Sequence, residues 1–160
     1  MIQQFPKRIT KENSFTFSIS QSGIYSIVIT ARCHAYEDLR VEIDSLKYNN
    51  IPSSWNGTQL KGLAKTIIFI LKLKSGEHTL RFIPVKGGFI DEYKIENITD
   101  LEKIQFNLGI HAEDGDRRPW LTFVLVNLPL KSISADVSAK WHFLDGDDVK
   151  LIVDGQIKKN

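Results

Sequence analysis

The sequence predicts an all-β protein built as a β-sandwich, and three observations lead to this prediction. Short segments alternate apolar and polar residues with a period of two, as strands with one buried face do. Residues that favour turns separate these segments at steady intervals, which is typical of a sandwich. No segment has a convincing helical period beyond a short stretch near residues 100–103.

The first strands are predicted between residues 15 and 43. Residues 15–20 (FTFSIS) alternate apolar and polar side chains, and a Gln-Ser-Gly turn follows them. Residues 24–33 (IYSIVITARC) and 39–43 (LRVEI) continue the pattern with β-branched residues. The side chains expected to face the core are Ile27, Ile29, Ala31 and Cys33 on one strand and Leu39, Val41 and Ile43 on the next.

Three more segments complete the predicted unit. Residues 66–73 (TIIFILKL) are apolar at nearly every position, which suits a strand covered on both faces. The turn at 74–77 (KSGE) predicts a hairpin into residues 78–84 (HTLRFIP). Residues 89–98 (FIDEYKIENI) form the last predicted strand, and their apolar alternation slips once.

The composition is that of an ordinary folded domain. The chain has 160 residues, of which 42% are apolar and 25% charged. The net charge of +2 is too balanced for a protein that binds nucleic acid through a basic stripe. The single cysteine excludes an internal disulfide framework and a cysteine-based zinc site. Because no apolar run reaches about 18 residues, we expect no membrane span, and residues 1–10 carry no signal peptide.

The chain repeats itself at a constant offset of 110 residues, the difference between positions 148 and 38. Residues 147–160 (DDVKLIVDGQIKKN) match residues 37–50 (EDLRVEIDSLKYNN). The identical pairs are Asp38 and Asp148, Asp44 and Asp154, and Asn50 and Asn160. Upstream of the second copy, apolar side chains alternate strictly with polar ones and predict a strand; they are Ile133, Ala135, Val137, Ala139, Trp141 and Phe143. At the same offset, the last four stand where Ile27, Ile29, Ala31 and Cys33 stand.

The repeat predicts two units in tandem. Residues 1–100 are expected to form a complete sandwich module, and residues 101–160 a linker followed by the first strands of a second, incomplete copy. Residues 120–128 (WLTFVLVNL) are assigned to that copy as a continuous apolar strand. Unpaired strands invite association, so we expect self-association through the open edges of this half-module.

Three pieces of the chain between residues 15 and 98 resemble a known family. They are SGIYSIVITARC with DLRVEIDSL, LKLKSGEHTLRFIP, and GGFIDEYKIENI. These motifs resemble the galactose-binding-like jelly-roll sandwiches, a group that holds many carbohydrate-binding modules of secreted bacterial enzymes. The chain also looks like repeated modules of surface or exported proteins from small-genome bacteria. The resemblance implies a jelly-roll fold and a non-catalytic module, extracellular or at the cell surface, whose partner is a polysaccharide or glycan.

The resemblance also implies where such a ligand binds. Relatives use loop aromatics as sugar platforms, and Trp55 fits that description, with Asn56 and Gln59 beside it for the sugar hydroxyls. The alternative is that Trp55 folds back and caps the open end of the sandwich. Relatives often place an Asn before the last strand, where this chain has Gly88.

A structural calcium ion is the cofactor that the resemblance implies. The counterparts of its ligands are Glu37, Asp38 and Asp91. Calcium needs several oxygens at about 2.4 Å, and neighbouring carboxylates on a loop can supply them. The simpler interpretation of these acidic clusters is a set of solvated turns, where Asp and Gly are favoured for backbone reasons.

We expect no enzymatic activity. The four histidines are scattered, and the chain has no nucleophile elbow, P-loop or dinucleotide-binding motif. A glycosidase needs only two carboxylates in a cleft, but nothing in the sequence selects a pair. The alternative to a carbohydrate-binding module is a structural or adhesive spacer with no small-molecule ligand.

Overall fold

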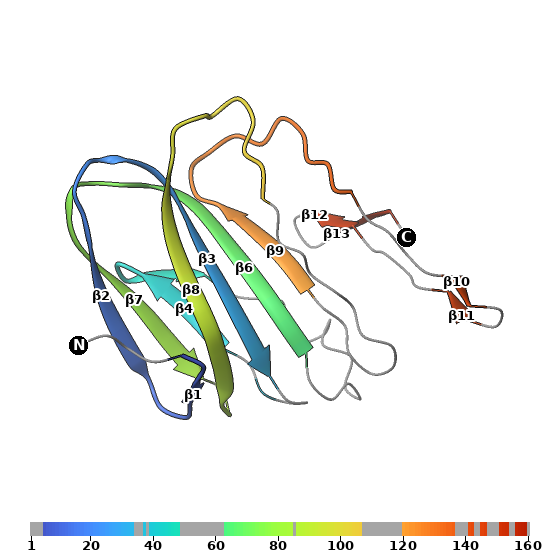
Figure 1. Cartoon of the computed structure of the whole chain (residues 1–160), viewed down its shortest axis with the longest axis horizontal. Coiled ribbons are helices and arrows are strands. Elements are labelled where there is room, and N and C mark those ends of the chain that lie inside the picture. The colour runs from blue at the N-terminus through green and yellow to red at the C-terminus, as the bar shows by residue number, and fades with distance from the viewer. Residues whose placement is uncertain are drawn as a thin grey trace. The chain divides into compact units, whose positions relative to one another are not determined.

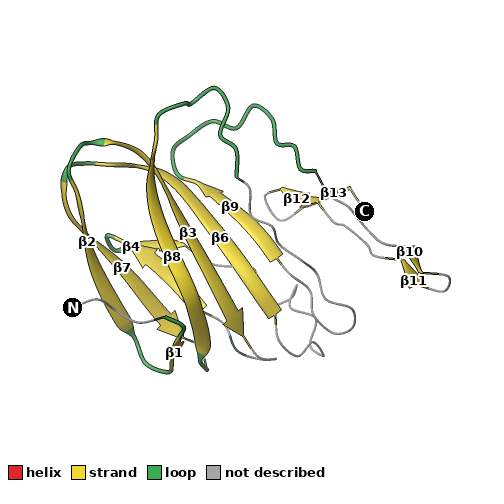
Figure 2. Ribbon diagram, viewed as in Figure 1, coloured by secondary structure: helices red, strands yellow, loops and turns green. Residues whose placement is uncertain are grey.

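The computed structural model describes residues 5–33, 37, 39–48, 63–84, 86–106, 120–136, 141–142, 145–146, 151–153 and 156–159. Over these ranges the chain forms strands and no helix, as Figures 1 and 2 show. The all-β prediction is therefore confirmed. The chain divides into two compact units, Met1–Pro129 and Leu130–Asn160.

The first unit contains two sheets. The first sheet has five strands in the order β1 (Lys7–Ile9), β8 (Gly88–Ile98), β3 (Gly23–Cys33), β6 (Leu63–Leu73) and β9 (Trp120–Leu125). The second has four strands in the order β2 (Asn13–Ile19), β7 (Gly76–Pro84), β4 (Leu39–Ile43) and β5 (Leu46–Tyr48). All pairs within these two sheets are antiparallel except β6 with β9, which is parallel.

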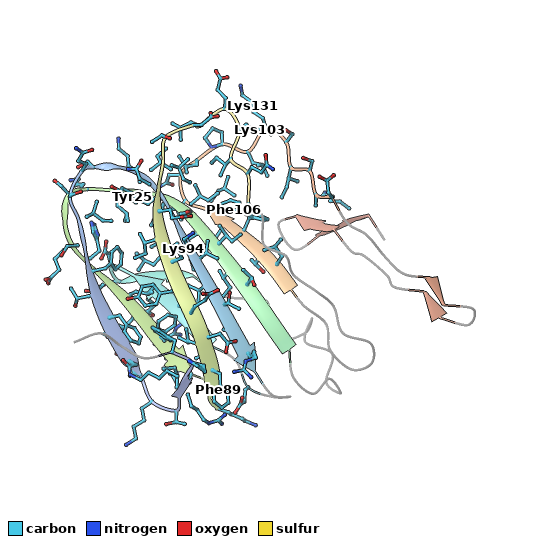
Figure 3. The ribbon with its side chains drawn as sticks, viewed as in Figure 1. Tyr25, Phe89, Lys94, Lys103, Phe106 and Lys131 are labelled. Carbon is cyan, nitrogen blue, oxygen red and sulfur yellow. The ribbon has the colours of Figure 1, made fainter. Side chains whose placement is uncertain are left out.

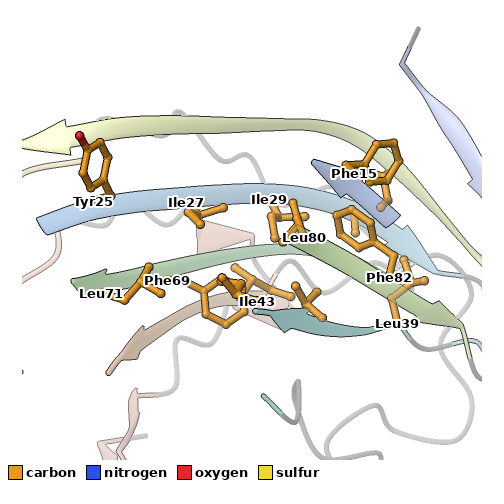
Figure 4. Close-up of a cluster of buried hydrophobic side chains, with 14 of the residues drawn as sticks. Phe15, Tyr25, Ile27, Ile29, Leu39, Ile43, Phe69, Leu71, Leu80 and Phe82 are labelled. Carbon is orange, nitrogen blue, oxygen red and sulfur yellow. The ribbon is translucent and has the colours of Figure 1, made fainter. Parts of the chain in front are cut away.

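The core lies between the inner faces of the two sheets, where side chains of alternate residues meet (Figure 4). The first sheet contributes Ile27 and Ile29, and the second contributes Leu80 and Phe82, all four fully buried. Phe82 also meets Phe15 edge to face at 5.4 Å between ring centroids. Each such side chain contributes roughly 1.5–3 kcal/mol through burial. The predicted inward residues are confirmed for Ala31 on β3 and for Leu39, Val41 and Ile43 on β4, and the side chain of Cys33 lies outside the described part.

Strand β6 is buried on both faces, as its sequence predicted. Every residue from Thr66 to Leu71 is buried. Ile67, Phe69 and Leu71 belong to the core, whereas Ile68 and Ile70 point to the opposite face of the first sheet. On that face Phe106 packs against Phe123 of the neighbouring strand β9 at 5.7 Å.

The predicted hairpin at residues 74–77 is wrong. Strands β6 and β7 belong to different sheets, so this turn carries the chain across the sandwich. The backbone N–H of Ser75 donates to the hydroxyl oxygen of Ser22 at 2.8 Å, which ties this crossing to the turn between β2 and β3. Turn residues and period-two strands look the same in a hairpin and in a crossing, so the sequence could not separate the two.

Strand β9 joins the first sheet rather than the second unit. It pairs with β6 along its whole length, from Lys65 opposite Trp120 to Ile70 opposite Leu125. The predicted strand that begins at Ile133 is also wrong in its first part, because residues 131–136 form no strand and Ile133 is 42% exposed. The module boundary at residue 100 and the incomplete second copy stay predictions.

The second unit contains two short hairpins. Strand β10 (Trp141–His142) pairs with β11 (Asp145–Gly146), and β12 (Leu151–Val153) pairs with β13 (Gln156–Lys159). The hairpin of β12 and β13 is the second member of the sequence repeat, and β4 with β5 is the first. Their registers agree at the 110-residue offset for the two pairs nearest the turn: Ile43 pairs with Leu46 and Glu42 with Lys47, while Val153 pairs with Gln156 and Ile152 with Ile157. A register shift after Leu151 makes the third pair differ. Both repeated segments are therefore hairpins.

Candidate functional site

Two arginines flank a phenylalanine at one end of the first sheet. Phe89 is directly opposite Arg8 of β1 on one side and Arg32 of β3 on the other. The guanidinium carbons lie 4.8 Å (Arg8) and 5.3 Å (Arg32) from the centre of the Phe89 ring. Because the adjacent residues Ile9 and Ile90 are buried in the core, these three side chains point away from it. We call them the arginine–phenylalanine row, and Figure 3 shows Phe89 near the start of β8.

A β-bulge brings Asp91 to the same row. The register between β3 and β8 shifts between Thr30 and Ala31, so Asp91 has no residue directly opposite it. Its carboxylate accepts from Arg32 Nε at 2.8 and 2.9 Å and from Arg32 Nη2 at 2.7 Å. Bulges commonly re-aim a side chain in this way. The bulge is also the slip in the predicted alternation.

Glu37 forms an ion pair with Arg8, the second arginine of the row. Arg8 Nη2 donates to Glu37 Oε1 at 2.6 Å, and the Glu37 side chain is only 10% exposed. Gly87 lies against this pair with a φ of +137°, and a Cβ there would come within 3.0 Å of both Arg8 Nη2 and Glu37 Oε1. Glycine is therefore required beside the pair for both its conformation and its size.

The charges of the site balance. Hydrogen bonds to Asp91 raise the pKa of Arg32, burial opposes this, and the charge of Asp91 adds to the rise, so the guanidinium stays charged. Two guanidinium groups face two carboxylates, and the Arg32 side chain is still 55% exposed. A guanidinium has five N–H donors, of which Asp91 engages those on Nε and Nη2. The site offers donors, acceptors and an aromatic ring without a large net charge.

The sugar-binding residues predicted from the sequence, Trp55, Asn56 and Gln59, lie outside the described residues. Their loop joins β5 to β6, and it rejoins the sheet at Leu63, which pairs with Cys33. The next residue along β6 pairs with Arg32 itself. One end of the predicted sugar-binding loop therefore lies beside the arginine–phenylalanine row.

Of the three predicted calcium ligands, Asp38 lies outside the described residues. Glu37 and Asp91 each accept hydrogen bonds from an arginine. Within the described ranges, no three or more His, Cys, Asp or Glu side chains are placed to hold a metal ion. The calcium site stays a prediction.

Sequence reasoning missed Arg8, Arg32 and Phe89 as site residues. They lie far apart in the sequence and meet only because β1 and β3 both pair with β8. One signal was present. Phe89 and Asp91 break the apolar alternation directly after two glycines, and such a break is typical of a bulge.

These features define the class of the protein as a two-sheet β-sandwich with a charge-balanced aromatic site at one end of a sheet. Comparison of the chain with protein-family models, curated proteins and solved structures found no match in any of the three. The galactose-binding-like assignment therefore stays a prediction. Across the described ranges, no helix has the length and apolar character needed to cross a membrane.

Proposed function

We propose that this chain is a non-catalytic carbohydrate-binding module of an exported or cell-surface protein. The ligand, a polysaccharide or glycan, binds at the arginine–phenylalanine row together with the loop that carries Trp55. The observation that supports this most strongly is the row itself, in which an aromatic ring is surrounded by paired guanidinium and carboxylate groups at the protein surface.

The chemistry of the row suits a neutral sugar. Sugar hydroxyls both donate and accept hydrogen bonds, so carboxylate oxygens and guanidinium N–H groups can serve the same ligand. An aromatic ring offers apolar contact to the C–H face of a pyranose. Because the two arginines are balanced by Glu37 and Asp91, the row lacks the excess positive charge that would favour phosphate or nucleic acid.

The tandem arrangement belongs to the same proposal. The two pairs nearest the turn match between the repeated hairpins, which supports a second module that begins in the C-terminal unit. Modules in tandem raise the avidity for a repeating polymer even where each site binds weakly. The jelly-roll topology and a structural calcium ion are proposed on the resemblance alone.

A glycan array, read with and without calcium, tests the proposal. Wild-type protein should bind one class of glycan, and Trp55→Ala and Arg32→Met should each remove most of the signal. Lys94→Met is the matched control. Lys94 is a cation on β8, its side chain is 67% exposed, and it pairs with Val28, four residues before Arg32 on β3. Equal loss in the control variant would show a general charge effect and would count against the site.

The alternative function, a structural or adhesive spacer, is favoured by one observation. Arg8 and Arg32 already have carboxylate partners, so the row is stable without a ligand. A glycan array that stays blank at high protein concentration, with and without calcium, would support the spacer. A hydrolytic enzyme would require two carboxylates facing each other across a cleft at glycosidase distance.

A further inference from the structure

The outer strands of the two sheets differ in how they are protected. Strands β1 and β5 have three residues each and carry Lys7, Arg8 and Lys47. Strand β2 presents Ser14, Thr16 and Ser18 to solvent. Strand β9 (WLTFVL) has no charged residue, no proline and no bulge in its pairing with β6. Short length, charge and bulges are the usual devices that keep strand edges from pairing with other chains. Both β2 and β9 lack them, but β2 exposes hydroxyl side chains whereas β9 exposes Leu121.

The free side of β9 can be located from its pairing. The backbone N–H of Val126, just after the strand, donates to the carbonyl oxygen of Ile70 on β6 at 3.0 Å. Backbone N–H and C=O groups of successive residues alternate between the two sides of a strand. Those of Leu121, Phe123 and Leu125 therefore point away from β6. Among the described strands, β6 alone is hydrogen-bonded to β9, so β9 is the last strand of the five-stranded sheet (Figure 1).

The same strand exposes apolar surface. Leu121 is 40% exposed, and it lies on the face of the sheet where Phe123 packs against Phe106. Exposed apolar side chains beside an unprotected strand edge are the features of a surface that binds another strand.

We propose that β9 is an association site for β9 of a second copy of this chain, paired antiparallel about a two-fold axis at Phe123. Such an axis sets Leu121 of one copy opposite Leu125 of the other, and Thr122 opposite Val124. The strand is its own complement, because it has leucine at both outer positions and β-branched residues at both inner ones. A two-fold interface requires this self-complementarity, and pairing joins two five-stranded sheets into one.

Sedimentation equilibrium of the full chain over micromolar to millimolar concentrations tests the association. Wild-type protein should show a monomer–dimer equilibrium, and Leu121→Lys should raise the dissociation constant by a factor of about ten or more. Leu101→Lys is the matched control, since it removes a more exposed leucine outside β9, and it should leave the constant unchanged. A monomeric wild-type chain, or an equal effect of both variants, would overturn the proposal. A monomeric chain would favour a different protein as the source of the strand that pairs with β9.

Cysteine cross-linking tests the register independently. In a Cys33→Ser background, an oxidised mixture of Leu121→Cys and Leu125→Cys chains should form mixed disulfide dimers, because paired residues lie about 5.5 Å apart between Cα atoms. Neither variant alone should cross-link comparably, since each cysteine would face a leucine. Self-cross-linking of either variant as efficient as that of the mixture would contradict the two-fold axis at Phe123.

Discussion

The imidazole of His78 donates a hydrogen bond to the carboxylate of Asp44, with 2.6 Å between Nδ1 and Oδ2. Its other nitrogen, Nε2, lies 2.7 Å from the carbonyl oxygen of Lys74. Both neighbours accept hydrogen bonds, so both ring nitrogens can donate at once only when the ring is protonated, and this geometry favours the imidazolium ion. It also stacks on the ring of Phe17 at 5.5 Å.

Asp44 uses its remaining groups to fix the turn between β4 and β5. Its Oδ1 accepts from the backbone N–H of Thr79 at 2.9 Å, and its own N–H donates to the Thr79 carbonyl oxygen at 3.0 Å. Asp44 and Ser45 both have positive φ values, 48° and 67°, as the two-residue turns favoured in hairpins require. The pair of His78 and Asp44 therefore anchors this hairpin to β7.

The first prediction concerns pH. Burial alone would lower the pKa of His78, but the hydrogen bonds to Asp44 and Lys74 and the charge of Asp44 outweigh it and raise that pKa. A raised pKa in the folded state gives stability that is fully present below about pH 6.5, the unfolded value. This stability is lost as pH rises through the folded-state pKa. Urea unfolding of wild type and His78→Gln should therefore differ most at acidic pH and converge at alkaline pH. A difference that does not change with pH would contradict the imidazolium assignment.

The second prediction concerns the turn itself. Ser45 adopts a left-handed conformation that glycine adopts without steric cost, and the second repeat has Gly155 at this position. Ser45→Gly should stabilise the folded chain by about 0.5–1 kcal/mol in urea unfolding. Ser75→Gly is the matched control, since Ser75 lies in another turn without a positive φ and should show no gain. Equal effects of the two substitutions on the free energy of unfolding would contradict this explanation of the turn.

A third prediction concerns Glu42, which is 2% exposed although it points away from the core. Its carboxylate oxygens lie 3.3 Å from Arg81 Nη1 and 3.4 Å from Arg40 Nε. Glu42→Ala leaves both guanidinium groups without this partner and should cost about 1–3 kcal/mol, less than a fully buried pair because both arginines reach solvent. The double variant Glu42→Leu/Arg81→Leu should cost less than the single one in urea unfolding. A larger loss in the double variant would show that the ion pairs of Arg81 with Glu42 and Glu12 stabilise the sheet.

The fourth prediction separates the core from the proposed site. Phe82 is fully buried between the sheets, so Phe82→Ala should destabilise the protein by about 3–5 kcal/mol in urea unfolding. Phe89 lies on the face of the first sheet that points away from the core. Phe89→Ala removes two exposed cation–π contacts, worth about 0.5–1 kcal/mol each. It should leave the fold intact and weaken glycan binding. Unfolding of Phe89→Ala at the midpoint of Phe82→Ala would show that Phe89 is structural.

The strands could be predicted from the sequence because burial on one face imposes a period of two. Residues 39–43 match β4 at both ends, and the double-sided burial of β6 followed from its continuous apolar run. Sheet membership could not be predicted, since the turn at 74–77 and the parallel pairing of β9 depend on contacts between distant segments. The site was hidden for the same reason: Arg8 and Arg32 meet at Phe89 only through two separate strand pairings.

An NMR titration of backbone amides with the glycan selected on the array tests the central claim most directly. The account predicts that the shifts concentrate at Arg8, Arg32 and Phe89 and in the loop of residues 49–62, and that Arg32→Met abolishes them. Shifts confined to the outer face of the second sheet, around Thr16 and Thr79, would contradict it. So would a spectrum that every tested glycan leaves unchanged.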